Sequence, residues 1–86
     1  MAYRNKYESV DELVHKIPNP EIRAEAYKFV SRHKVVTVSK LADFTEEQIR
    51  KRGYSDALID ALELGLREEY NLHFSSRQLY KRMPGV

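Results

Sequence analysis

Residues 55–70 read SDALIDALELGLREEY, and this stretch decides the fold that the sequence predicts. Serine is a favoured helix N-cap, and apolar residues follow Ser55 at the three- and four-residue spacing of one helix face. That face comprises Leu58, Ile59, Ala61, Leu62, Gly65, Leu66 and Tyr70. Ala61 and Gly65 are small enough to let a second helix approach closely. We therefore expect residues 55–70 to form the longest helix and the centre of the domain.

Signals that start and stop helices recur through the rest of the chain. Three pairs have the spacing of capping boxes, namely Ser9 with Glu12, Thr45 with Gln48 and Ser75 with Gln78. Asn19 followed by Pro20 is typical of another helix start, and Gly53 is a natural left-handed C-cap. The further helices predicted span about 10–17, 20–32, 45–53 and 76–82, with a single turn through Leu41 capped by Thr37 or Ser39.

The stretch 34–38, KVVTV, is the only one with strand character. A single short run without a partner cannot form a sheet, so we interpret it as a buried connector. The sequence therefore predicts an all-α fold, a compact bundle of five or six short helices. We expect one domain over residues 1–86, with flexible ends at 1–8 and 83–86.

Composition excludes several classes of protein. The chain has 86 residues, of which 42% are hydrophobic and 33% charged, so it is too apolar to be disordered. It contains no cysteine, which rules out disulfides and cysteine zinc sites. No apolar stretch has transmembrane length and no targeting segment is evident, so we expect a cytoplasmic protein without membrane contact.

Catalysis has no support in the sequence. The histidines His15, His33 and His73 are scattered, without an HExxH pair or a carboxylate at ligand spacing, and we interpret them as surface residues. No glycine-rich phosphate loop or nucleophile elbow is present. We therefore predict no catalytic residue, no metal and no cofactor. The tyrosines Tyr27, Tyr54 and Tyr70 lie where amphipathic helices bury aromatic residues, so we expect them in the core.

Charge is segregated along the chain, although the net charge is only +2. The predicted helix 55–70 is mostly acidic on its polar side, whereas no acid follows Asn71. We select as candidate nucleic-acid-binding residues Lys34, Arg50, Lys51, Arg52, Arg77, Lys81 and Arg82. Cations at helix C-termini also stabilise the helix dipole, which is the simpler explanation of such clusters. Candidate protein-interaction residues on the acidic helix are Asp60, Glu63 and Leu64.

Residues 21–74 resemble the C-terminal domain of the bacterial RNA polymerase alpha subunit. The resemblance rests on the connector 35–38, on Leu41-Ala42, on TEEQI at 45–49, and on Ile59, Leu62, Leu66 and Asn71-Leu72. It implies a compact helical fold akin to helix-hairpin-helix and sterile alpha motif domains.

The DNA-binding positions of that family match less well. Its minor-groove arginine corresponds only to Arg23, which requires a short insertion after this residue, and no asparagine stands three residues on. Its Gly-Lys-Lys-Ser turn is replaced by SDAL at 55–58, where Asp56 would repel phosphate. The resemblance therefore supports the fold more than the function.

Residues 37–52 also resemble the entry of a helix-turn-helix. In that interpretation the helix 46–52 enters the major groove with Gln48, Arg50, Lys51 and Arg52 as its polar face. Both resemblances favour a nucleic-acid-binding or transcription-associated protein. The alternative is a protein-interaction module of the sterile alpha motif kind, which self-associates or binds the transcription machinery through its acidic helix and basic tail.

Overall fold

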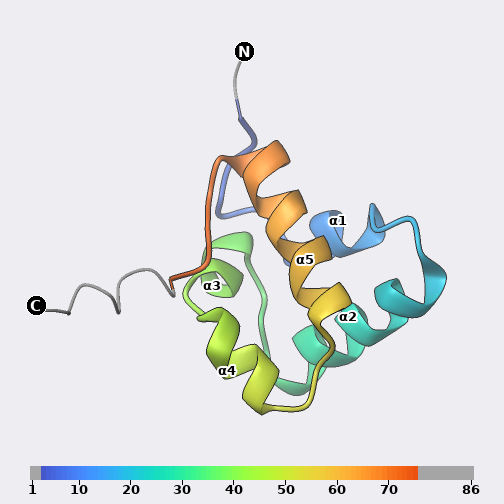
Figure 1. Ribbon diagram of the computed structural model, residues 1–86. Coiled ribbons are helices and arrows are strands. Elements are labelled where there is room, and N and C mark those ends of the chain that lie inside the picture. The colour runs from blue at the N-terminus through green and yellow to red at the C-terminus, as the bar shows by residue number, and fades with distance from the viewer. Residues whose placement is uncertain (1–2, 76–86) are drawn as a thin grey trace, which may run out of the picture.

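The computed structural model describes residues 3–75, which contain helices and no strand (Figure 1). The expected all-α fold is confirmed. In chain order, the elements are α1 (Val10–His15), α2 (Pro20–Arg32), α3 (Val38–Ala42), α4 (Glu46–Lys51), α5 (Asp56–Gly65) and the π-helical turn η1 (Leu66–Tyr70). The helix predicted over 76–82 lies outside the described residues.

Side-chain caps begin the helices where the sequence predicts them. Asn19 accepts hydrogen bonds from the backbone N–H groups of Glu21 and Ile22, and Thr45 and Gln48 form the complete capping box. The single turn is capped by Thr37, which accepts from the N–H of Lys40. These caps satisfy backbone donors that a helix cannot satisfy internally.

The first predicted capping box is incomplete. Ser9 accepts a hydrogen bond from the N–H of Asp11, one residue earlier than the box geometry requires. The N–H of Glu12 bonds instead to the backbone carbonyl of Ser9. Ser9 is thus a simple N-cap, and α1 ends at His15, two residues before the predicted end.

The long helix predicted over 55–70 is divided at Gly65. α5 has 10 residues, and α2, with 13, is the longest α-helix of the described chain. The turn that follows is π-helical and ends at Asn71, which adopts the left-handed conformation with φ 58°. The N–H of Leu72 reaches back to the carbonyl of Leu66 at 3.0 Å, one residue farther than the bond that usually closes a helix ending in this conformation.

The predicted apolar face of α5 forms the centre of the core. Leu58, Ile59, Leu62 and Leu66 are buried, and α5 lies across α1 and α2 (Figure 1). A Cβ atom on Gly65 would lie 3.0 Å from Cγ of Leu13 in α1. The expected close helix approach is therefore confirmed, and α1 is the helix that uses it.

Two of the three tyrosines expected in the core are there. Tyr54 and Tyr70 are buried, whereas Tyr27 is 37% exposed. The prediction for Tyr27 was wrong because its neighbours on α2, Ala26, Phe29 and Val30, occupy the face that meets α5. The turn of about 100° per residue places Tyr27 beside that face.

The connector pairs with the segment before α1. The N–H of Val10 donates to Val36 O at 2.9 Å and that of Val38 donates to Glu8 O at 3.0 Å, which makes an isolated antiparallel bridge. The connector is thus a buried link, as expected, with Val35 and Val38 inside and Val36 outside.

The segment before Ser9 is held against the helices. The N–H of Arg4 donates to Glu69 O at 2.9 Å, and the N–H of Ser39 donates to Lys6 O at 2.8 Å. Figure 1 shows this segment beside the end of the helix formed by α5 and η1. No helix within residues 3–75 is long and apolar enough to cross a membrane.

Leu62 provides a test of the core. It is fully buried in α5, so we expect Leu62→Ala to lower the free energy of unfolding by about 2–5 kcal/mol through lost burial and the cavity left behind. Leu64→Ala is the matched control, because Leu64 is on the same helix and 52% exposed. Urea denaturation measures both. A loss of a few tenths of a kcal/mol for both variants would contradict this assignment of the core.

Candidate nucleic-acid interface

Five cations gather on one side of the domain and define what we call the basic surface. They are Arg32 at the end of α2, Lys34 in the connector, Lys40 in α3, and Lys51 and Arg52 at the end of α4. All five are exposed. None forms an ion pair with a carboxylate of residues 3–75.

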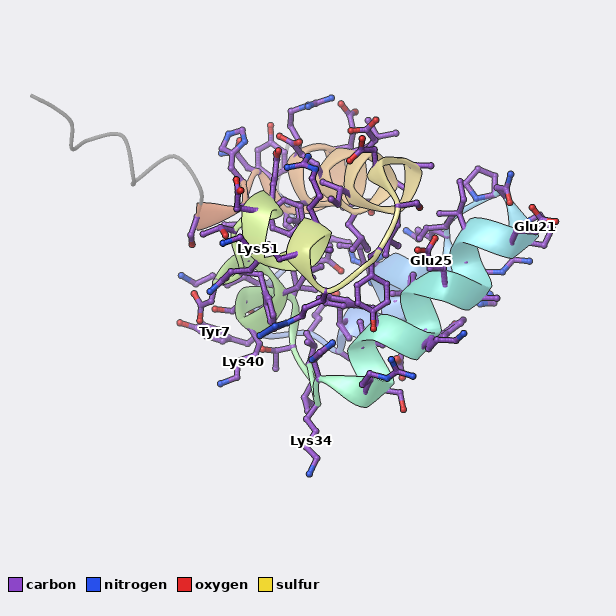
Figure 2. All side chains as sticks on the ribbon, turned by 60° about the horizontal axis from the view of Figure 1, so that its bottom comes forward. Tyr7, Glu21, Glu25, Lys34, Lys40 and Lys51 are labelled. Atoms are coloured by element: carbon purple, nitrogen blue, oxygen red, sulfur yellow. The ribbon has the colours of Figure 1, made fainter. Side chains whose placement is uncertain are left out.

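Figure 2 shows the basic surface from one side. Lys34, Lys40 and Lys51 lie with Tyr7 on the left and lower part of this view, whereas Glu21 and Glu25 lie on α2, toward the right. Tyr7 is 67% exposed. Cations of three helices and the connector therefore face the same solvent.

Lys34 reaches this surface through an unusual backbone conformation. It has φ 56°, in the left-handed region that non-glycine residues rarely adopt. The N–H of Val35 can then close on Val30 O at 2.9 Å and end α2. The sharp turn sends Val35 into the core and leaves Lys34 in solvent.

A shallow hollow of about 340 Å³ lies within the basic surface. Its lining residues come from the end of α2, from α3 and from α4, and they are His33, Lys40, Asp43, Phe44, Gln48 and Arg52. Two cations, an amide and an aromatic ring therefore face a single opening. Asp43 is the one carboxylate in this lining.

His33 is part of this hollow and is not the lone surface histidine that the sequence predicted. Its ring lies 5.2 Å from that of Phe29 and 5.9 Å from that of Tyr54, between centroids. The Tyr54 hydroxyl is 3.4 Å from Nε2 of His33. Burial lowers the pKa of His33, and the charges of Arg52 and Arg32 lower it further.

Arg50 lies beside a carboxylate, whereas the sequence predicts a basic cluster without neighbouring acids. Its Nε donates to Asp56 Oδ1 at 3.0 Å, across the loop that joins α4 to α5. This hydrogen bond raises the pKa of Arg50. Sequence proximity to Lys51 and Arg52 was misleading here, because three consecutive helical residues point in directions about 100° apart. Arg77, Lys81 and Arg82 lie outside the described residues.

The predicted protein-interaction residues separate into two places. Glu63 and Asp60 lie near Glu46 of α4, where burial, then the carboxyl group of Glu63, and then Asp60 raise the pKa of Glu46. Leu64 instead borders an apolar groove between α1 and α5. The acidic surface and the exposed leucine are therefore different features of α5.

Several residues at the positions suggested by the two family resemblances have structural roles. Nη1 of Arg23 donates to Ile17 O at 2.6 Å, so this arginine holds the loop between α1 and α2. α3 and α4 have only 5 and 6 residues. Ile49 of α4 is buried, which ties the predicted recognition helix to the core.

Lys40 is a member of the basic surface that the sequence analysis missed, and Arg32, which shares a basic cluster with Lys34, was not selected with it. Lys40 belongs to no basic cluster along the chain, because it is the one cation of α3. The position of α3 beside the end of α2 places these side chains next to Arg52. The sequence did contain one signal for Lys40 as a surface cation. Lys40 follows the Thr37 cap and lies on the polar side of a one-turn helix.

No known protein family, curated protein or solved structure matches this chain. The resemblance to the RNA polymerase alpha C-terminal domain therefore remains a prediction. Within the described residues, no group of three histidine or acidic side chains is placed to hold a metal ion.

His33 reports on the electrostatics of the basic surface. We expect an NMR titration of its imidazole protons to give a pKa below the ordinary 6.5, because burial and neighbouring cations disfavour the charged form. Arg52→Gln should raise this pKa, whereas Arg50→Gln should change it less. A midpoint at or above 6.5 in the wild type would contradict the described environment.

The same shift predicts a pH dependence of stability. The unfolded state binds the His33 proton more readily than the folded state does. The contribution of His33 to stability is therefore present above pH 6.5 and is lost as the pH falls through that value toward the folded-state pKa. Urea denaturation between about pH 5 and 8 should show this loss, and His33→Gln should flatten it.

Proposed function

We propose that this protein binds the phosphate backbone of nucleic acid through the basic surface, as a binding protein and not as an enzyme. The observation that carries the proposal is that all five cations of this surface are exposed and without an ion pair among residues 3–75. A cation neutralised by a neighbouring carboxylate contributes little to an anionic ligand, whereas an unpaired one releases a counterion from each phosphate it contacts.

Several cations outside the basic surface are paired with carboxylates, and this difference supports the assignment. Arg4 and Lys16 both contact Glu69, at 3.6 and 3.1 Å, and Arg50 contacts Asp56. These three cations therefore stabilise local structure, whereas the five cations of the basic surface form no ion pair among residues 3–75. The two kinds of cation differ by position in the fold and not by residue type.

The proposed contact is to the backbone and largely independent of base sequence. α3 and α4, at 5 and 6 residues, are short for a helix that must cross the major groove. Lysine and arginine side chains on several short elements suit phosphates along a curved or irregular path. We propose, as part of the same function, that the protein is cytoplasmic and associated with transcription.

The test replaces three cations of the basic surface at once. We expect Lys40→Gln, Lys51→Gln and Arg52→Gln together to weaken binding of mixed-sequence DNA duplexes, and to lower the slope of log K against log salt by roughly one unit per lost contact. Fluorescence anisotropy across a salt series of about 50–200 mM measures both quantities. A single-stranded probe of the same length shows which form is preferred.

A second triple variant has the same net charge and is the control. Lys16→Gln, Arg50→Gln and Arg67→Gln remove three cations that contact Glu69, Asp56 and Glu68 respectively. We expect this variant to keep the wild-type affinity and slope within about twofold, because screened surface pairs contribute little. Equal weakening by both triples, or no binding by the wild type at low salt, would contradict the proposal.

The predicted basic tail adds an independent arm to this experiment. Replacing Arg77, Lys81 and Arg82 by glutamine should lower the salt slope by a similar amount if these residues also contact phosphate. Contacts at separate phosphates release counterions independently, so combining both triples should lower the slope additively.

A further inference from the structure

Tyr7 is the most exposed tyrosine or phenylalanine within residues 3–75. It is 67% exposed, compared with 57% for Tyr3 and 37% for Tyr27. In Figure 2 it lies with Lys40 and Lys51 on the left of the view, beside the cations of the basic surface. An aromatic ring in solvent therefore stands next to cations that have no ion pair within residues 3–75.

Hydrogen bonds on both flanks fix the backbone of Tyr7. The preceding carbonyl, Lys6 O, accepts from the N–H of Ser39 at 2.8 Å. The following carbonyl, Glu8 O, accepts from the N–H of Val38 at 3.0 Å. Both donors belong to α3, the helix that contributes one cation to the basic surface. The ring is therefore positioned before any ligand binds, and binding loses little conformational freedom of the chain.

The charges next to Tyr7 favour an anionic ligand. Nζ of Lys6 lies 5.4 Å from the centroid of the Tyr7 ring, and Lys6 forms no ion pair within residues 3–75. The adjacent acid, Glu8, is already engaged, because its Oε1 is 2.9 Å from Nη2 of Arg4 and accepts from the Tyr70 hydroxyl at 3.4 Å. The neighbouring carboxylate is thus neutralised by an arginine, whereas the neighbouring lysine is unpaired.

We infer that the basic surface binds single-stranded nucleic acid, with one unpaired base stacked on the ring of Tyr7 and the adjoining phosphates on the cations beside it. This inference rests on the proposed function and specifies the form of nucleic acid. Any unpaired base has a π face that can stack on an aromatic side chain, whereas the bases of a duplex are stacked on one another. DNA and RNA strands share this chemistry.

Fluorescence anisotropy of the full chain with three probes tests the inference. The probes are a mixed-sequence single strand, the duplex of the same length and an abasic single strand, which has the backbone without the bases. Tyr7→Ala should weaken binding of the single strand by about tenfold, as expected for one lost stack between a base and an aromatic ring. Its affinity for the duplex and the abasic strand should stay within about twofold of the wild-type value. The salt slope should not change, because a neutral ring releases no counterion.

Two further variants are controls. Tyr7→Phe keeps the ring and should keep the wild-type affinity. Tyr3→Ala removes another exposed tyrosine of the same segment and should have no effect. Circular dichroism checks that each variant stays folded. NMR of the wild type gives a measurement that needs no variant, since the ring protons of Tyr7 should shift upfield with the single strand and not with the abasic strand.

Several results would overturn the inference while leaving the proposed function in place. They are equal weakening of all three probes by Tyr7→Ala, no weakening of the single strand, or an equal loss with Tyr3→Ala. The expected pattern with either a DNA or an RNA strand supports the inference, and its absence with both overturns it. Failure of the wild type to bind any probe at low salt would instead overturn the proposed function itself.

Discussion

The aromatic ring of Phe29 is the contact on which the basic surface depends. Its centroid lies 5.3 Å from that of Phe44 and 5.0 Å from that of Tyr54, both in edge-to-face orientation, and 5.2 Å from that of His33. These rings join the end of α2 to the loop before α4 and to the loop before α5. Such pairs contribute about 0.5–1.5 kcal/mol each beyond the burial of their surface. They hold three chain segments together at the place where the cations meet.

Packing around α5 explains why the apolar groove and the basic surface lie on different elements. α5 contacts α1, α2 and α4, so each of these helices turns its own polar side outward. Gly65 lets α1 approach until a groove remains beside Leu64, whereas the C-terminal ends of α2 and α4 meet around His33 and Arg52. The groove and the basic surface therefore lie on separate faces of one core.

The cations of this protein differ in whether a carboxylate pairs with them, and this difference matters more than the net charge. The net charge of +2 indicates no strong affinity for polyanions. However, several carboxylates are already engaged, as Glu69 is with Lys16 and Arg4, and this pairing lowers the pKa of Glu69. The five cations of the basic surface have no such pairing among residues 3–75 and form a local excess on one face. Local excess charge, and not net charge, sets the potential that a phosphate backbone meets.

Glu25 of α2, which is distant in sequence, supports the cap that Ser55 provides for α5. Its two carboxylate oxygens accept hydrogen bonds from the N–H and the hydroxyl of Ser55, at 2.9 and 2.8 Å. Ser55 in turn caps α5 through the N–H of Leu58. The cap itself was predictable from neighbouring residues, but its support by α2 was not.

Local chemistry determined the helices, their caps and the all-α class, because a capping side chain or an apolar repeat acts within a few residues of itself. Tertiary contacts decided the rest. Arg50 faces Asp56 while Arg52 faces His33, although both belong to one basic run. Lys40 joins the basic surface from a separate helix, and Leu64 gains its groove only when α1 packs on Gly65. Those placements depend on how helices pack, which charge and spacing along the chain do not specify.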